Sequence, residues 1–408
     1  MSNLHIPGAD AADRGSAPRT PVVHRTDVAI MGAGLGGSLA AAILGRAGYD
    51  VTLVDLHAVY PPDFRVEKIA GDQVALMRKL GFLDAIAAQA TRVDEIVNAA
   101  SGRVLDRSVG EHYSIVYGDI VKVARAQIPP QVKFIVGRAA DIETSADRQR
   151  VTLSGGDVVD ARLVILATGQ GDVLRQKLGI RREVVFPKHS LSFGFTLAPT
   201  ALPEGFQALT YYGEQRDHRI DYLTLLPLGD TLRANLFTFC DHRDRWARAF
   251  RDEPKRMLLQ VLPGLARFLP DFEVVGKAQL FMMDLSVVAD HVRDGTVLIG
   301  DAFQTSCPAA GTGVSRLLVD VDRLCNGHIP GWLATPGMGA DKIARFYADP
   351  AKRAADLKAS RAAEYRRSLT VDTGLGWELH RRQVHLRRRT LGWVADRLRP
   401  FRRTAGAR

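Results

Sequence analysis

The chain has 408 residues, of which 46% are hydrophobic and 25% are charged, and its formal net charge is +10. This composition is typical of a globular protein of two or three compact units and excludes a disordered or fibrous chain. Three widely spaced cysteines exclude a disulfide scaffold, and no apolar run approaches the roughly 20 residues of a membrane-spanning helix. We therefore expect a protein of the reducing cytoplasm, with no metal site.

The positive charge is concentrated at one end of the chain. Residues 352–408 contain 16 Lys and Arg against 5 Asp and Glu, whereas residues 1–351 contain 39 against 40. The body is therefore close to neutral and only the tail is basic. This distribution argues against nucleic-acid binding by the whole protein.

Residues 26–55 predict a strand, a glycine turn, an alanine-rich helix and a second strand, which together form one βαβ unit. Gly32, Gly34 and Gly37 give the spacing G-x-G-x-x-G at the turn, and Asp55 ends the second strand. Such a turn lets backbone amides reach a pyrophosphate, and the acid can accept hydrogen bonds from a ribose without a 2′-phosphate. The unit therefore predicts dinucleotide binding.

The hydropathy pattern changes twice along the rest of the chain. Residues 158–169 and 294–301 are apolar enough for buried parallel strands, whereas apolar and polar residues alternate from Phe186 onward, with a hairpin turn expected at 228–231. We expect four units: a flexible lead over 1–24, a discontinuous α/β domain over 25–180 and 276–330, an inserted β-rich domain over 181–275, and a helical basic region over 331–408.

A second glycine-containing loop follows the apolar run at 294–301. Gly300 and Asp301 begin it, and Pro308, Gly311 and Gly313 lead into a predicted helix. No lysine follows these glycines, so the loop is not a phosphate loop for nucleotide hydrolysis.

The order of these motifs resembles that of FAD-dependent monooxygenases of the aromatic-hydroxylase type (group A, similar to para-hydroxybenzoate hydroxylase). This superfamily also contains flavin-dependent geranylgeranyl reductases and halogenases. Its third motif, G-D-A followed by P-x-x-G-x-G, is matched at every fixed position of residues 300–313, and the resemblance covers about residues 27–326. It implies an α/β fold with a Rossmann-like (GR2-type) FAD-binding domain and parallel sheet, an inserted β-rich substrate domain and a C-terminal helical region. The W-x-W-x-I-P motif of halogenases is absent from the sequence.

The resemblance implies that both glycine loops hold one extended FAD, with Asp301 near its ribityl or pyrophosphate region. Amides near Gly313 and Val314, at a helix N-terminus, would stabilise negative charge on the reduced flavin. Arg65 stands where family members often bring a basic residue to the phosphates, although a solvated surface arginine is the alternative. The expected cofactor-binding residues are Gly32, Gly34, Gly37, Asp55, Arg65, Thr168, Gly169, Gly300, Asp301, Pro308, Gly311, Thr312, Gly313 and Val314.

The middle family motif is matched only in part by residues 166–180. Thr168 stands where the hydroxylases usually have Asp, a residue that the family links to FAD and to the nicotinamide donor, and Tyr117 stands about where an arginine is expected. Two functions stay open. The first is a monooxygenase that uses NAD(P)H and O2 and hydroxylates or epoxidises a hydrophobic or aromatic substrate through a flavin C4a-hydroperoxide. The second is an FAD-dependent reductase or dehydrogenase of carbon–carbon double bonds.

Catalytic residues are weakly indicated. In the resembling hydroxylases an Arg and a Tyr precede a strand that ends in Pro-Leu, and Arg219 and Tyr222 occupy such positions here. His189 and His218 could act as acid or base, but a lone histidine is more often structural. Alternating aromatic residues in the insert could form pocket walls or core: Phe193, Phe195, Tyr211, Tyr212, Tyr222, Phe237 and Phe239.

The basic tail predicts an amphipathic helix. Leu379, Leu386 and Trp393 recur at intervals of seven, with arginines on the other side. Three roles stay open: packing on the protein's own body, docking on an acidic partner, and peripheral contact with anionic lipid at the inner face of the membrane.

Overall fold

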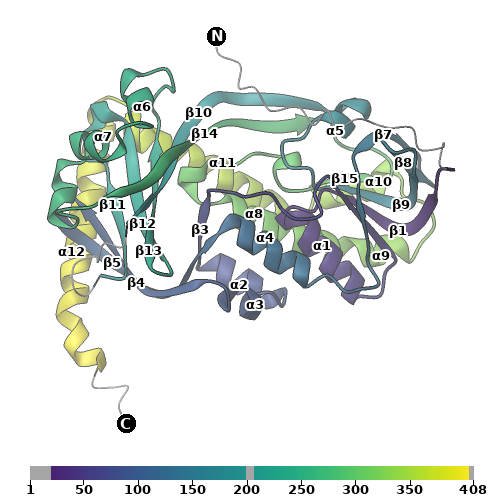
Figure 1. Ribbon diagram of the computed structural model, residues 1–408, viewed down its shortest axis with the longest axis horizontal. Helices are drawn as coiled ribbons and strands as arrows, with labels where there is room; N and C mark the ends of the chain where they lie inside the picture. The colour runs from purple at the N-terminus through teal and green to yellow at the C-terminus, as the bar shows by residue number, and fades with distance from the viewer. Residues whose placement is uncertain (1–19, 199–205, 404–408) are drawn as a thin grey trace.

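The computed structural model describes residues 20–198 and 206–403, with side chains described up to residue 390. Two sheets lie at opposite ends of the long axis, and two long strands along the top of the view connect them (Figure 1). Most of the predicted lead over 1–24 falls outside the described residues.

The first sheet has seven strands, of which the central ones are parallel, as the apolar runs predict. The strand order is β6-β2-β1-β9-β8-β7, and β15 also pairs with β9. The antiparallel β7 and β8 extend the sheet beyond β9. The strands are β1 (Val23–Met31), β2 (Val51–Asp55), β6 (Lys133–Val136), β7 (Ala139–Thr144), β8 (Gln149–Leu153), β9 (Val158–Leu166) and β15 (Thr296–Leu298).

Helices cover one face of this sheet. Apolar side chains of β1, β2, β9 and β15 pack there with those of several helices in one continuous core, whereas side chains of β7 and β8 pack against the other face. The covering helices are α1 (Leu35–Arg46), α2 (Asp72–Lys79), α3 (Leu83–Ala87), α4 (Tyr117–Ala126), α8 (Gly313–Asp322), α9 (Ile329–Leu333) and α10 (Ala340–Tyr347). A short α5 (Val173–Lys177) follows β9. This core fixes the glycine loop between β1 and α1.

The second sheet has eight strands in the order β14-β10-β13-β12-β11-β4-β5-β3, antiparallel except for β11 with β4. The predicted hairpin is confirmed, because Leu228 pairs with Thr231 at the turn. The strands are β3 (Val66–Ala70), β4 (Thr91–Ala100), β5 (Arg103–Val116), β10 (Arg181–Leu197), β11 (Ala208–Tyr212), β12 (Ile220–Leu228), β13 (Thr231–Thr238) and β14 (Val274–Ala289).

The two faces of the second sheet differ in chemistry. One face is apolar and packs on α6 (Arg245–Ala249) and α7 (Pro254–Val261), with Phe250 lying 4.5 Å from Phe193 between ring centroids. Along the strands the side chains alternate, so the neighbouring residues Ser192 and Asn235 belong to the opposite face. That face turns toward the first sheet.

The domain division stays a prediction, and the sheet pairing adds a feature that the hydropathy pattern did not reveal. Strands β3, β4 and β5, from the part of the chain assigned to the FAD-binding domain, pair in the second sheet, and β14 extends to Ala289. Pairing between strands distant in the chain depends on tertiary packing, which local patterns do not encode.

The C-terminal helices connect the two halves. Helix α11 (Pro350–Val371) contacts α8 of the first half and β12 of the second. Helix α12 (Leu375–Arg403) lies along the outer side of the second sheet next to β5 (Figure 1). Within the described ranges, none of the helices combines the length and the apolar character that crossing a bilayer requires.

His189, on β10, gives the fold a pH-dependent component. It is 1% exposed between the rings of Phe186 and Phe239, and neither ring nitrogen has a hydrogen-bond partner among the described residues. Burial, and secondarily the nearby Arg367, lowers the pKa of His189 to about 4. The folded protein therefore accommodates the neutral ring. The unfolded chain binds a proton at His189 more readily, so the free energy of unfolding falls as the pH drops from about 6.5 toward 4.

We expect the free energy of unfolding to fall by about 2 kcal/mol more in the natural chain than in His189→Leu when the pH drops from about 7.5 to about 5. Urea unfolding followed by circular dichroism at both pH values measures the difference. Equal losses in the two proteins would contradict the assignment.

Candidate cofactor and substrate site

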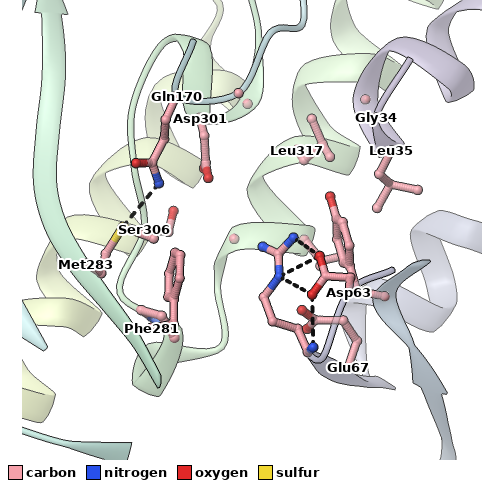
Figure 2. A pocket seen from close by; sticks show the side chains of 18 of the residues that line it. Gly34, Leu35, Asp63, Glu67, Gln170, Phe281, Met283, Asp301, Ser306 and Leu317 are labelled. Atoms are coloured by element: carbon pink, nitrogen blue, oxygen red, sulfur yellow. Dashed lines mark hydrogen bonds and ion pairs between the residues drawn. The ribbon is translucent and has the colours of Figure 1, made fainter. Parts of the chain in front are cut away.

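One cavity of about 720 Å³ lies between the two sheets (Figure 2). Its volume falls within the roughly 300–1,000 Å³ of ligand pockets. It brings together twelve of the fourteen expected cofactor-binding residues: Gly32, Gly34, Asp55, Arg65, Thr168, Gly169, Gly300, Asp301, Pro308, Gly311, Gly313 and Val314. No grouping of His, Cys, Asp or Glu among the described residues is suited to a metal ion.

The first glycine loop is packed so closely that side chains are excluded at two positions. A Cβ on Gly32, whose φ is +101°, would lie 2.6 Å from the carbonyl oxygen of Ala167, and a Cβ on Gly37 would lie 1.8 Å from the carbonyl oxygen of Gly32. Gly32 thus lets the loop touch the segment after β9. Gly37 does not line the cavity, and its role is packing between helix and loop.

Gly34 differs from these two glycines. It lines the cavity, its φ is −69°, and a Cβ added there would meet no protein atom within 4 Å. A side chain at this position would therefore project into the cavity rather than into the protein. The open space beside α1's N-terminus suits an anion, because the first amides of a helix have no partner within it.

Asp55 lies at the cavity beside the same loop. Its carboxylate accepts hydrogen bonds from the amides of Ala33 (2.6 Å) and His57 (2.8 Å). Arg125 of α4 lies 3.5 Å from Asp55 and donates from Nε to the carbonyl oxygen of Ala33 (2.8 Å). The backbone of the first glycine loop therefore holds the Asp55 carboxylate in place at the cavity. Arg125 contacts both Asp55 and the loop and so fixes their relative position.

The second glycine loop forms the opposite part of the wall. Gly300, with φ of +61°, starts a short helical turn, and Asp301 follows it with its side chain partly exposed to the cavity. Burial raises the pKa of Asp301, while Arg316, Arg65 and Arg182 oppose this effect. The three guanidinium groups around Asp301 favour its charged form, in which both carboxylate oxygens can accept hydrogen bonds.

Arg65 is a cavity residue rather than a solvated surface arginine. Its Nε donates to both oxygens of Asp63 at 3.0 Å, and its guanidinium lies 4.2 Å from the ring centre of Tyr117. Burial opposes ionisation of Asp63, but the hydrogen bonds from Arg65 lower the pKa of Asp63 below its usual range. Arg65 and Asp63 thus form a fixed ion pair at the cavity wall.

The second sheet supplies a mostly apolar wall. Phe237, Phe281 and Met283 line the cavity, and Gln170 donates to the Met283 sulfur at 3.7 Å (Figure 2). Ser192 adds a buried hydroxyl with no hydrogen-bond partner in the part of the chain that the structure describes. Such a surface suits a flat apolar ligand with a polar substituent.

Glu67, on β3, lines the cavity and lies across it from Phe281 (Figure 2). Burial raises the pKa of Glu67; Asp63 and Asp301 reinforce this effect, and Arg65 opposes it. The raised pKa makes Glu67 a candidate for exchanging a proton or a hydrogen bond with a ligand.

The weak catalytic candidates, Arg219 and Tyr222, are not among the residues that line the cavity, and a catalytic role for them stays a prediction. The hydroxyl of Tyr222 donates to the carbonyl oxygen of Ala309 at 2.8 Å, and the guanidinium of Arg366 lies 5.0 Å from its ring centre. Arg219 ends a helical turn with φ of +53°. Tyr222 therefore supports the second glycine loop from behind, and nothing brings Arg219 to the cavity.

Several other residues that the sequence singled out lie in the core or in turns and do not line the cavity. His218 bonds to a backbone carbonyl of Val261 (3.3 Å), and Thr312 precedes α8 without lining the cavity. Of the insert's aromatic residues, Phe195 and Tyr211 belong to the core, whereas Phe237 is part of the wall.

Sequence reasoning missed one segment of the wall completely. Residues 60–64, between β2 and β3, line the cavity with Tyr60, Pro62, Asp63 and Phe64, and Phe64 packs against Gly194 of β10. The run "YPPDF" carries no motif, and only its aromatic and proline content could have singled it out. Phe281 and Met283 were missed because β14 was not assigned to the insert.

Comparison with known proteins agrees with this geometry. Residues 25–326 match a protein family described as "FAD binding domain". One relative is 3-demethoxyubiquinol 3-hydroxylase of Escherichia coli (strain K12), 24% identical over 328 residues that cover 73% of this chain and 78% of the relative. Another is 6-hydroxynicotinate 3-monooxygenase of Bordetella bronchiseptica, 28% identical over 321 residues that cover 73% of this chain and 81% of the relative.

Solved structures show the same fold. A p-nitrophenol 4-monooxygenase from Pseudomonas putida DLL-E4 has a TM-score of 0.74 at 16% identity, with 91% of this chain and 94% of that one covered. A halogenase in complex with phloroglucinol and FAD has a TM-score of 0.64 at 15% identity, with 79% of this chain and 72% of that one covered. The cavity and its open glycine position fit an FAD, because the space beside Gly34 is free of protein atoms.

We expect opposite effects when Gly34 and Gly37 are each replaced by alanine. Gly34→Ala should leave the free energy of unfolding within about 0.5 kcal/mol, since the methyl group meets no protein atom. It should weaken FAD binding at least about tenfold, because the methyl group occupies the cofactor's space. Gly37→Ala should instead cost more than about 2 kcal/mol, because its methyl group overlaps the Gly32 carbonyl.

Thermal melts and titration of the flavin-free protein with FAD, followed by flavin fluorescence, separate the two effects. Unchanged FAD affinity in Gly34→Ala would show that the cofactor does not pass this glycine.

Proposed function

The chain belongs to the FAD binding domain family and binds FAD, and on that premise we propose that it is a monooxygenase. In this proposal it hydroxylates or epoxidises a hydrophobic or aromatic organic molecule, with O2 as co-substrate and NAD(P)H as electron donor. The observation that carries the proposal is the cavity of about 720 Å³, which extends from the loops at the ends of parallel strands to the aromatic wall of the second sheet.

The two loops would hold the two ends of the cofactor. Gly34 and Asp55 would take the adenosine side, Arg65 the phosphates, and Asp301 the ribityl side, while the first amides of α8 would face the flavin ring. When bound and reduced, the flavin activates O2, so that one oxygen atom enters the substrate, the other leaves as water, and NAD(P)H is oxidised to NAD(P)+.

The protein's own contribution at the substrate end is orientation and exclusion of water. Phe237, Phe281 and Met283 would hold an apolar ring, and Ser192 would hydrogen-bond a neutral substituent. Glu67 would accept a hydrogen bond from a hydroxyl or N–H group of the substrate. A dry wall matters because water competes with the substrate for the activated oxygen.

The reductase alternative has one sequence feature in its favour, namely Thr168 in place of the family's usual Asp. Thr168 lines the cavity and its hydroxyl donates to the carbonyl oxygen of Gly171 at 3.4 Å, so it offers no carboxylate there. The relatives named as hydroxylase and monooxygenase favour oxygen insertion.

Oxygen consumption separates the two activities. We expect the purified protein to be yellow and to consume O2 and NAD(P)H in equal amounts with an accepted substrate, and mass spectrometry after reaction under ¹⁸O₂ should find one labelled oxygen in the product. Glu67→Gln should lower kcat/KM by at least about tenfold for substrates with a hydroxyl group. Turnover without O2 to a saturated or desaturated product would overturn the proposal in favour of the reductase.

We also propose that α12 makes peripheral contact with anionic lipid, at the cytoplasmic side of a membrane. Leu375, Leu379 and Leu386 are 80%, 56% and 62% exposed and recur along one side of the helix. Arg382 and Arg389 continue this side at spacings of three and four residues and are also exposed. The leucines of the predicted seam thus point to solvent, not to the protein's body.

The opposite side of α12 packs against the second sheet, where the helix contacts β5. Trp377 and Val384 are half-buried there, and Arg388 lies 4.5 Å from the ring centre of Tyr212 and 3.9 Å from Asp106. A helix held on one side and apolar and cationic on the other suits a lipid surface. The side chain of Trp393, which the predicted seam included, lies outside the described residues.

Sedimentation with vesicles tests the contact. We expect the full chain to sediment with vesicles that contain phosphatidylserine but not with pure phosphatidylcholine, and Leu379→Gln with Leu386→Gln to reduce sedimentation at least about threefold. Gln383→Ala is the matched exposed control. Equal sedimentation of the full chain and of a chain lacking residues 372–408 would contradict the proposal, and a concentration-dependent dimer would indicate a second copy as the occupant.

A further inference from the structure

Four charged side chains, three of them buried and the fourth half-buried, lie behind the second glycine loop. Arg316 and Asp320 belong to α8, Lys352 and Asp356 to α11, and the side chains of Arg316, Asp320 and Lys352 are 1%, 0% and 0% exposed. Burying charges is unfavourable unless each is paired with good geometry. Such a cluster persists only where its members are fixed by several partners.

Arg316 binds the loop itself. Its Nε donates to the hydroxyl of Ser306 at 3.2 Å, its Nη2 donates to the carbonyl oxygen of Gln304, and Nη2 lies 3.5 Å from the carboxylate of Asp301. One guanidinium group therefore contacts three residues of the loop between β15 and α8. Only a planar group with several donors can do this from a single position.

Asp320 and Lys352 fix the start of the same loop. Asp320 accepts a hydrogen bond from the amide of Gly300 (2.9 Å) and pairs with Lys352 (2.9 Å), which also pairs with Asp356 (3.1 Å). The Lys352 ammonium lies 4.0 Å from the ring centre of Phe303. These four charges sum to zero, and the Asp301 carboxylate, which Arg316 contacts, extends from the cluster to the cavity.

We propose that Arg316 is a positioning residue for FAD, which holds the Asp301 carboxylate against the cavity in the orientation that accepts hydrogen bonds from the cofactor's hydroxyl groups. The inference rests on the proposed cofactor site but concerns a residue that does not touch the cofactor. Arg316 does not line the cavity, whereas Asp301 does.

The charges around Asp301 give this role a pH signature. Burial raises the pKa of Asp301, and Arg316 is the strongest of the groups that oppose it. The charged and titratable groups that face Asp301 are Arg316 of α8, Arg65 before β3, Glu67 of β3, Tyr117 of α4 and Arg182 of β10. Removing Arg316 should therefore raise the pKa of Asp301 further, and protonation would replace an acceptor oxygen with a donor.

The test is titration of the flavin-free full chain with FAD across about pH 5.5 to 8.5, followed by flavin fluorescence. For Arg316→Met we expect a Kd at least about tenfold higher than in the natural chain at pH 8, with the gap widening as the pH falls. Arg316→Lys should recover part of the affinity, because it keeps the charge but not the planar group. Adding Asp301→Asn to Arg316→Met should abolish the extra pH dependence.

Arg323→Met is the matched control, because Arg323 directly follows α8 but pairs with Asp349 (2.8 Å) rather than with the loop. A natural Kd and pH profile in a folded Arg316→Met protein would overturn the inference. If Arg316→Met does not fold, Arg316→Lys decides: an unchanged profile overturns the inference and a weakened, pH-dependent one supports it. Failure of the natural chain to bind FAD would instead overturn the proposed function.

Discussion

The site depends on a constraint of parallel sheets, namely that neighbouring parallel strands end at the same edge. Strand β9 pairs in parallel with both β1 and β15, so the loops that follow these three strands lie side by side although they are far apart in the chain. The contact between Gly32 and Ala167 is close enough to exclude any side chain. The three loops thereby form one continuous wall, at the edge where open α/β sheets bind ligands.

The second sheet can form a core and a wall of the cavity at once because its two faces differ in chemistry. Residues such as Phe195 and Leu236 point toward α6 and α7 and form a core, while the alternate residues Ser192 and Phe237 face the first half of the molecule. A strand has a side-chain period of two, so a single run of residues can build a core and a ligand wall at once. The substrate end can therefore change without disturbing the core.

Helix α11 holds these two walls together through buried ion pairs. Lys352 pairs with Asp320 behind the second glycine loop, and near the other end of the helix Arg366 forms a two-pronged pair with Asp221 of β12. Removing one partner of a buried pair typically costs about 3–5 kcal/mol, because the other charge stays buried without a partner, so both partners are required at each end of α11. The ring of Tyr222 lies 5.0 Å from the Arg366 guanidinium, and its hydroxyl donates to the carbonyl oxygen of Ala309, which couples the second sheet to the loop beside the cofactor site.

The sequence by itself determined the features that are local. The spacing of Gly32, Gly34 and Gly37 and the loop that starts at Gly300 specified a dinucleotide fold, because backbone conformation and close approach require these residues at fixed separations. Tertiary structure alone decided which residues complete the cavity and which support its wall from outside. Glu67, Phe281 and the guanidinium of Arg316 act through partners that lie far away in the chain or on other elements, and no local pattern encodes such contacts. The outward side of α12 was decided in the same way, because a periodic pattern marks a helix face but packing chooses which face is buried.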